Sequence, residues 1–236
     1  MNGGKTYKLL SSISGKYGFQ NIFDDFTQMV VCAYSMGRME EQYLKIAKKY
    51  EPKELEVFAN ALGEMVLEYE SASLEGGWDD IIGNIYEMSG SSNAKTGQFF
   101  TPKSICDLMA NFCNHQGEYV NDPSAGSSRN LVAHSRQNPN NRFTSFYVAQ
   151  DLDNRCINMS VINFIMYGLK GVVIHCDTLS MKVYKGYRIY LPETGLFVAP
   201  LNENQALSYL IGEKTSEIEE PKTEEPIKKV VQLELF

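Results

Sequence analysis

The stretch Asp122-Pro123-Ser124-Ala125-Gly126-Ser127-Ser128 decides the fold, because it joins a predicted strand at residues 118–122 to a predicted helix at residues 128–137. A strand that ends in a carboxylate before a Gly/Ser-rich turn into a helix suits a small-molecule cofactor. Gly126 lets the backbone approach a ligand closely, and the free amides of the helix N-terminus favour an anionic group such as a carboxylate or phosphate. By itself the turn is a weak indication of function.

Around this turn, helical segments alternate with short runs rich in β-branched and aromatic residues, which is typical of βα units and a parallel sheet. The predicted elements are helices at residues 102–114, 128–137 and 154–167, strands at 118–122, 145–150 and 172–176, and a hairpin formed by 181–190 and 196–199. We therefore predict a shortened doubly wound, Rossmann-like α/β domain over residues 96–210.

The residues before this domain have a helical pattern. Apolar residues recur at three- and four-residue intervals over 52–69, and amphipathic stretches cover 22–36 and 39–50. Residues 71–77 form a polar break before a short helical pattern at 78–87. We predict a helical N-terminal domain over residues 1–95. The charged, Pro-containing segment that follows the α/β domain, residues 211–236, is predicted to be a disordered tail.

The composition bounds the class of protein. The 236 residues are 43% hydrophobic, enough for a core, and the formal net charge of −7 argues against binding nucleic acid by bulk electrostatics. The longest apolar run is far shorter than the ~20 residues of a membrane-spanning helix, and the N-terminus lacks a signal-peptide pattern. The five cysteines and three histidines lack metal-ligand spacing. We predict a cytoplasmic protein with no membrane contact and no metal.

Two further carboxylates strengthen the cofactor interpretation. Asp151 follows the second predicted strand and Asp177 the third, so with Asp122 they should cluster at the carboxyl edge of one sheet. An acid in the position of Asp151 can accept hydrogen bonds from ribose hydroxyls, and one in the position of Asp177 can accept from an adenine amine. The alternative is that strand-end aspartates only cap helices or fill turns.

These residues carry a resemblance to a known family. The segments are Gly97-Gln98-Phe99-Phe100-Thr101-Pro102, Asp122-Pro123-Ser124-Ala125-Gly126-Ser127, Asp151, and Cys176-Asp177-Thr178-Leu179. In order and spacing they resemble the modification subunits of type I restriction systems, which are S-adenosylmethionine-dependent N6-adenine DNA methyltransferases. The resemblance implies an S-adenosylmethionine cofactor and DNA as a partner, and the helical N-terminal segment also looks like the helical domain of that family.

The resemblance implies roles for individual residues. The segment that closes over the methionine part of the cofactor corresponds to Gln98, Phe99, Phe100, Thr101, Pro102 and Lys103. The loop around the cofactor's amino and carboxylate groups corresponds to Asp122, Ser124, Ala125, Gly126 and Ser127. Asp151 corresponds to the ribose ligand, and Asp177, followed by Thr178 and Leu179, to the adenine ligand. A purely structural interpretation of the first segment is a helix entry with Thr101 as N-cap and Pro102 in the first turn.

The sequence departs from the family at the catalytic tetrad. The family has Asn/Asp-Pro-Pro-aromatic after its fourth strand, which accepts hydrogens from the adenine amine and stacks on the flipped base. Here Ala199, Pro200, Leu201 and Asn202 stand at that place, so the catalytic residues are unknown. Two explanations fit: a cofactor-binding relative that acts by binding, as a non-catalytic adaptor, or a half-enzyme completed by a partner subunit. We favour the first, because a sheet split between chains would leave an unpaired buried edge.

Two other segments suggest partners. The predicted hairpin carries Lys182, Lys185 and Arg188 with tyrosines between them, which could touch DNA phosphates and stack on bases; the tyrosines could equally pack on the sheet.

The last five residues resemble the bacterial sliding-clamp-binding pentapeptide, with the contacts carried by Gln232, Leu233, Leu235 and Phe236. The Leu-Phe pair would fill an apolar pocket at the end of a flexible tether. The alternative is that residues 230–236 pair as an edge strand with their own domain.

Overall fold

The computed structural model describes residues 2–90, 99–113, 119–137, 140–192 and 195–211. The N-terminal helices are α1 (Gly4–Ser12), α2 (Ser14–Tyr17), α3 (Phe19–Ala33), α4 (Glu40–Ala47), α5 (Pro52–Gly76) and α6 (Ile81–Met88). The elements that follow are α7 (Lys103–Phe112), β1 (Tyr119–Asp122), α8 (Arg129–Gln137), α9 (Asn141–Thr144), β2 (Phe146–Asp151), α10 (Asn154–Tyr167), β3 (Gly171–Asp177), β4 (Lys182–Tyr190), β5 (Phe197–Leu201) and α11 (Glu203–Leu210).

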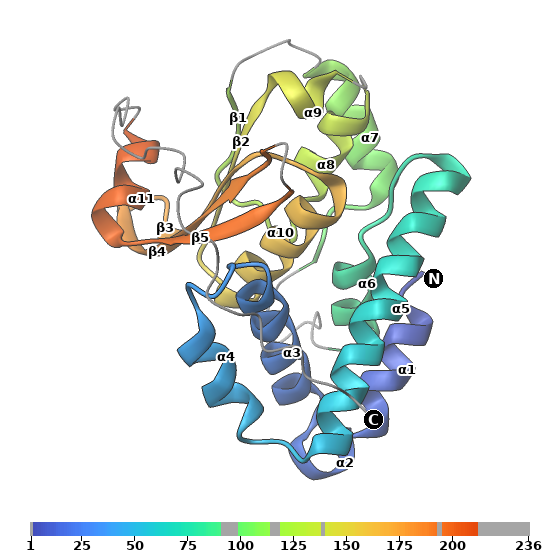
Figure 1. Ribbon diagram of the computed structural model, residues 1–236. Coiled ribbons are helices and arrows are strands. Elements are labelled where there is room, and N and C mark those ends of the chain that lie inside the picture. Colours follow the sequence, from blue (N-terminus) through green and yellow to red (C-terminus); the bar gives the residue numbers. More distant parts are fainter. Residues whose placement is uncertain (1, 91–98, 114–118, 138–139, 193–194, 212–236) are drawn as a thin grey trace.

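The strands form one mixed sheet in the order β1-β2-β3-β4-β5. β1, β2 and β3 are parallel, whereas β4 and β5 run antiparallel to their neighbours and form the predicted hairpin. Figure 1 shows the helical region packed beside this sheet. The predicted fold class, a helical N-terminal region followed by an α/β sheet, is confirmed.

The two faces of the sheet are covered differently. On one face α8 and α10 pack against the sheet, and their buried side chains join those of α3, α5 and α6 in one continuous core. On the other face α11 covers a smaller cluster that includes Val148, Val172 and Ile174. The helical region and the parallel strands are therefore held together by shared apolar burial.

The polar break predicted at residues 71–77 is wrong, because α5 continues to Gly76. Pro52 stands in the first turn of this helix, and a capping box between Glu51 and Glu54 begins it. No glycine or proline interrupts residues 71–75, and Ala72 is buried in the core. The polar composition of this stretch therefore reflects an exposed helix face.

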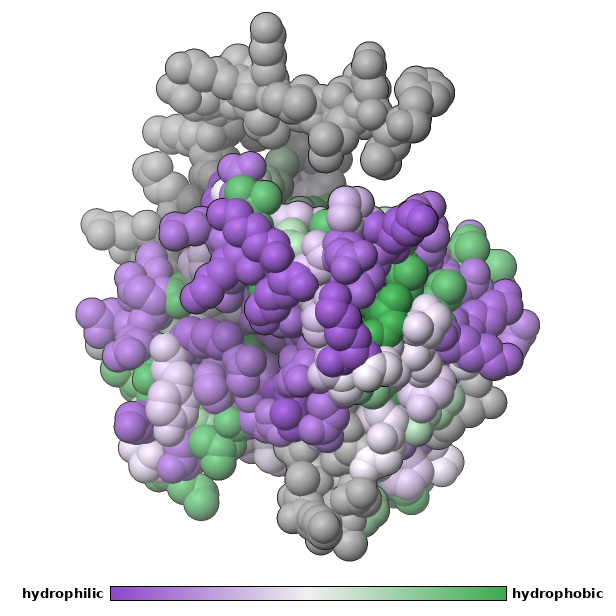
Figure 2. Space-filling model, turned by 90° about the horizontal axis from the view of Figure 1, so that it is seen from below, coloured by the Kyte–Doolittle hydropathy of each residue, from purple (hydrophilic) through white to green (hydrophobic). Residues whose placement is uncertain are grey.

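Two further features concern the surface and the chain end. Within the described ranges, no helix is both long and apolar enough to cross a membrane. The underside of the molecule in Figure 1, where α2 and α4 lie, presents mainly hydrophilic side chains (Figure 2). The tail over residues 212–236, with the residues proposed to bind the sliding clamp, lies outside the described residues.

Candidate functional site

The three aspartates predicted to cluster lie at the carboxyl ends of three neighbouring parallel strands. Asp122 ends β1, Asp151 ends β2 and Asp177 ends β3. Each accepts a hydrogen bond from a backbone amide two residues further on, at 3.1 Å from Ser124, 2.8 Å from Asp153 and 3.1 Å from Leu179. The acids therefore also have the turn-stabilising role that the alternative predicted. An ionised carboxylate has about four acceptor sites, so these bonds leave sites for a ligand.

The loop after β1 is held tightly against the end of β2. The Gly126 amide donates to Asp151 Oδ2 at 2.8 Å, and the Ala125 amide donates to the Gln150 carbonyl at 2.8 Å. Gly126 has a φ of +57°, and a Cβ on it would lie 3.1 Å from the ring of Phe100. A side chain here would be strained and would press on Phe100. The absence of a Cβ thus lets the Phe100 ring pack directly against the backbone of the loop.

Helix α10 supports the same loop from beneath. Ser160 donates its hydroxyl to the Gly126 carbonyl at 2.8 Å, and Ser128 donates to the Ser160 hydroxyl at 2.7 Å. Ser128 itself has a φ of +72°, a conformation that is uncommon for a residue with a side chain. The loop is preorganised by these bonds, which limits the entropy lost when a ligand binds.

The acids at the ends of β2 and β3 differ electrostatically. Burial raises the pKa of Asp151, against the opposing effect of the Asp153 and Gly126 amides. The pKa of Asp177 is lowered, chiefly by hydrogen bonds from the hydroxyl and amide of Ser180. Asp151 is thus a partly desolvated acceptor beside the glycine loop, and Asp177 is a half-buried acceptor whose charged form is stabilised by hydrogen bonds.

The end of β3 is tied to the loop after β1. Thr178 donates its hydroxyl to the Pro123 carbonyl at 2.9 Å. Leu179, the next residue, is 98% exposed. Thr178 therefore has a positioning contact, and the Leu179 side chain is free to cover a flat ligand.

The segment that precedes α7 contributes one aromatic side chain to this site. The Phe100 ring lies between the Gly126 loop and Tyr86, and the centroids of the Phe100 and Tyr86 rings are 5.7 Å apart. The neighbouring Phe99 is 75% exposed. The Lys103 ammonium instead lies 2.9 Å from Asp107 Oδ2 and over the ring of Trp78. Helix α7 has Pro102 at its N-cap and no side-chain capping bond, so the prediction of Thr101 as cap is wrong. Gln98 lies outside the described residues.

Ser127 points away from the loop surface, into a buried polar network that sequence reasoning missed. Asp80, which is 2% exposed, accepts hydrogen bonds from the Ser127 hydroxyl, from Arg129 Nε at 2.6 Å and from Asn163 Nδ2 at 2.8 Å. The guanidinium of Arg129 also donates to Asn84, to Glu87 and to the Thr101 carbonyl.

Arg129 is the first residue of α8, the helix after the glycine loop. Its side chain joins this helix to the helical region and to the segment that contains Thr101 and Phe100. The sequence signal was slight: Asp80 stands immediately before a helix, and its side chain accepts from the Gly83 amide as an N-cap. That position did not show that the same carboxylate is buried against an arginine 49 residues away.

Residues 199–202 do not lie beside the glycine loop. They belong to the end of β5 and the start of α11, and Asn202 caps that helix by accepting from the Gln205 amide at 2.9 Å. β5 and β1 are the opposite edges of the five-stranded sheet, which at ~4.8 Å between strands places them roughly 19 Å apart. Among the described residues, this segment cannot present an amine acceptor to a ligand held at β1.

The structure does not gather the three hairpin cations on one surface. Lys182 is next to the ring of Tyr184 at the carboxyl edge, and Arg188 lies over Phe146 on the α11 face of the sheet. Lys185 donates to the Tyr187 hydroxyl at 3.3 Å. Two of the interleaved tyrosines, at positions 187 and 190, are buried, as the sheet-packing alternative predicts for them.

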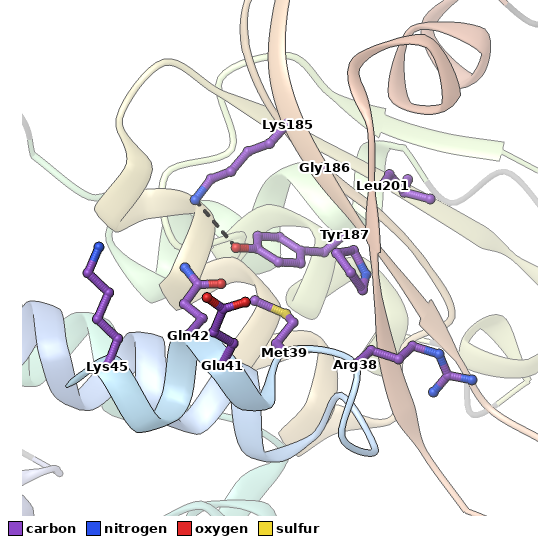
Figure 3. Close-up of a pocket in the computed structure, with 10 residues that line it drawn as sticks. Arg38, Met39, Glu41, Gln42, Lys45, Lys185, Gly186, Tyr187 and Leu201 are labelled. Carbon is purple, nitrogen blue, oxygen red and sulfur yellow. Dashed lines mark hydrogen bonds between the residues drawn. The ribbon is translucent and has the colours of Figure 1, made fainter. Parts of the chain in front are cut away.

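Lys185 also lines an open cleft of about 530 Å³ between α4 and the hairpin. Figure 3 shows Glu41 and Gln42 of α4 extending toward Tyr187, with Lys45 and Arg38 at the sides. The cleft is separate from the strand ends that carry the three aspartates.

Comparison with known proteins finds a partial family match. Residues 78–192 match the model of a family described as N-6 DNA Methylase. This segment of the chain is similar to the N-6 DNA methylase family. The family uses S-adenosylmethionine and has DNA as its substrate. The matched segment begins at Trp78, so it includes Asp80, Arg129 and the three strand-end aspartates. No solved structure shows a significant match to the chain.

Proposed function

We propose that this N-6 DNA methylase relative binds S-adenosylmethionine at the carboxyl ends of β1, β2 and β3, and that it does not transfer methyl groups without a further protein component. The observation that carries the first half is the Gly126 loop, where a backbone free of Cβ faces Phe100 and is bonded to Asp151. This arrangement fits a cofactor that combines a ribose, an adenine and a zwitterionic amino acid end.

The proposed contacts follow from the donors and acceptors at each point. Asp151 has the position and the partial burial to accept hydrogen bonds from ribose hydroxyls. Asp177 would accept from the adenine amine, with Leu179 against the ring, and Asp122 would accept from the amino group of the methionine part. The exposed Phe99 and the Phe100 backbone would close over that end.

The cofactor supplies a methyl group on a positively charged sulfur, which is a good electrophile. What remains for the protein is to desolvate and orient an adenine amine whose lone pair is delocalised into the ring. Loss of a transition-state hydrogen-bond acceptor costs about 2.7–4 kcal/mol, a factor of about a hundred to a thousand in rate. Residues 199–202 offer no such acceptor near β1, so transfer by the chain alone should be slow or absent.

Calorimetric titration of the full chain with S-adenosylmethionine tests the binding half. We expect affinity in the micromolar range, lowered roughly ten- to a hundredfold in Asp177→Asn, because a hydrogen bond to a charged acceptor is replaced by one to a neutral group. Asp177 lies in a turn at the end of β3, outside the apolar core, and asparagine keeps an oxygen that can accept from the Leu179 and Ser180 amides, so the variant should fold normally. Glu203→Gln, which neutralises an exposed acid at the start of α11, is the matched control. Absence of binding at millimolar cofactor would refute the proposal.

A further inference from the structure

We propose that the free edge of β1, together with the exposed apolar side chains of α7, is a docking surface for a second polypeptide that extends the sheet by at least two strands. The proposal rests on an unpaired strand, on an uncovered helix face beside it, and on the width of sheet that this helix face can cover. The docking surface itself does not depend on the proposed function. Only its effect on methyl transfer rests on the proposed function.

The first observation is the edge of β1. Among the described residues β1 pairs with β2 alone, whereas the outer edge of β3 is closed by the chain's own hairpin. Tyr119 and Asn121 of β1 are exposed. Natural edge strands are commonly protected by shortness, by charged side chains, by proline or by a bulge. β1 has four residues and ends in Asp122, and it contains no lysine, proline or bulge. The edge is exposed and not buried, so the objection raised above to a sheet shared between two chains does not apply.

The second observation is the surface of α7. Its buried residues are Cys106 and Ala110, and the helix packs against α8. Ile105, Leu108, Met109 and Phe112 recur at the spacing of a helix face that contacts a core, yet their exposed fractions are 45%, 50%, 44% and 78%. Helix α8 contacts both α7 and β1, so one helix connects the element that carries this stripe to the strand with the free edge. Such a contiguous exposed patch indicates an interaction site.

The dimensions indicate how much is missing. Neighbouring helices pack about 8–10 Å apart, and neighbouring strands lie about 4.8 Å apart. If α8 covers β1, the next helix in the layer therefore lies over the space of about two further strands. One added strand would leave part of the α7 stripe in water, so the occupant has to supply more than one.

This requirement excludes two simpler occupants. The chain's own tail contains one short β-forming segment, residues 230–236, which could add a single strand at most. A second copy could pair its β1 antiparallel to this one about a two-fold axis perpendicular to the sheet. Both copies would then carry their helices on the same face, and the α8 of the second copy would occupy the space under α7. A different polypeptide with at least two strands and an apolar face toward α7 satisfies both observations.

The topology agrees with this occupant. The unit β1-α8-β2-α10-β3 is one βαβαβ half of a doubly wound sheet, in which ligands bind at the switch point between the two halves. With β1 at the edge of the described sheet, the site we propose for the cofactor lies at the boundary of that sheet. A partner docked at β1 would form the other wall of that crevice, where a substrate amine has to approach.

Site-specific photo-crosslinking in cells tests the surface directly. A benzophenone amino acid is placed at Phe112, and at Leu74 of α5 as an equally exposed control on another helix. We expect position 112 to crosslink one other polypeptide several-fold more than position 74, and Leu108→Lys with Met109→Lys to abolish that crosslink while leaving the melting temperature of the purified chain unchanged. In the complex reconstituted with that polypeptide, hydrogen exchange at β1 should slow.

Three results would overturn the proposal: a crosslink from position 112 only to residues 212–236, a crosslink only to another copy of the chain, or no excess over position 74. Unchanged exchange at β1 in the reconstituted complex would also overturn it. Titration of S-adenosylmethionine into the unpartnered chain is independent of all these results. The docking surface and the cofactor site can therefore fail separately.

Discussion

The buried Asp80–Arg129 pair should be the most sensitive point of the structure, and Arg129→Met tests this. The substitution keeps a long apolar stem but removes the guanidinium. It leaves Asp80 without its cation and Glu87 without the partner at 3.1 Å from Arg129 Nη2. It also breaks the bond from Arg129 to the Thr101 carbonyl. The interface between α6, α8 and the Phe100 segment therefore loses its common donor.

The magnitude follows from burial. The side chains of Arg129 and Asp80 are 10% and 2% exposed, and removal of one partner from a buried pair costs about 3–5 kcal/mol, because a charge is left uncompensated. For a chain of this size that corresponds to a fall in Tm of roughly 10 °C. The matched control is Arg155→Met. Arg155 also joins the helical region to the α/β domain, through Asp24 at 2.9 Å, but these side chains are 34% and 37% exposed, so the cost should be below about 1 kcal/mol.

Thermal unfolding followed by circular dichroism measures both variants, and urea denaturation gives the free energies. A double-mutant cycle with Asp80→Asn separates the coupling of the pair from the loss of each side chain alone. The reasoning is refuted if Arg129→Met costs no more than Arg155→Met, or if the cycle gives no coupling energy. If Arg129→Met does not fold, Arg129→Lys takes its place in the comparison with Arg155→Met. Lysine keeps the charge but cannot reach all four acceptors at once.

Three further predictions concern the cofactor site and the tail. Gly126→Ala should lower S-adenosylmethionine affinity by roughly tenfold in calorimetry, because its Cβ would displace the Phe100 ring and strain the loop. As the pH is lowered, cofactor affinity should begin to fall above the pH range in which an ordinary carboxyl group is protonated, because burial raises the pKa of Asp151 and protonation removes an acceptor. In Asp151→Asn this early loss should disappear. Only the loss due to Asp177, whose pKa is lowered, should remain, and it should occur at lower pH. Deletion of residues 232–236 should abolish binding to an immobilised bacterial sliding clamp and leave cofactor affinity unchanged; clamp binding that survives the deletion would contradict the pentapeptide hypothesis.

Much of the α/β region could be predicted from the sequence because its signals are local. Helix α10 has the predicted bounds, since Asp153 caps its start and Gly168 ends it in the left-handed conformation. The parallel strands are within a residue or two of their predicted positions, because short β-branched runs stand between clear turns. The three aspartates could be placed at one edge because parallel strands share their carboxyl ends.

The contacts that the sequence did not predict are those between distant elements. Asp80 and Arg129 are separated by 49 residues and lie on different helices, and no local pattern links a carboxylate before one helix to an arginine in another. The position of residues 199–202 relative to the glycine loop depends on which edge of the sheet the fifth strand joins. That edge is decided by the antiparallel hairpin packing against α11, which hydrophobic periodicity does not reveal.

The exposed stripe on α7 shows a different limit of periodicity. The pattern of Ile105, Leu108, Met109 and Phe112 predicts a helix with one apolar face, and the helix is present. Periodicity predicts that a helix face is buried, but it does not predict whether the same chain or a partner chain buries it. The physical requirement, removal of apolar surface from water, is the same whichever chain covers the face. Among the described residues the sheet ends at β1, next to the strand ends of the proposed cofactor site. The isolated chain should therefore be competent in binding assays and deficient in transfer assays, and addition of the polypeptide that covers α7 should change the second result far more than the first.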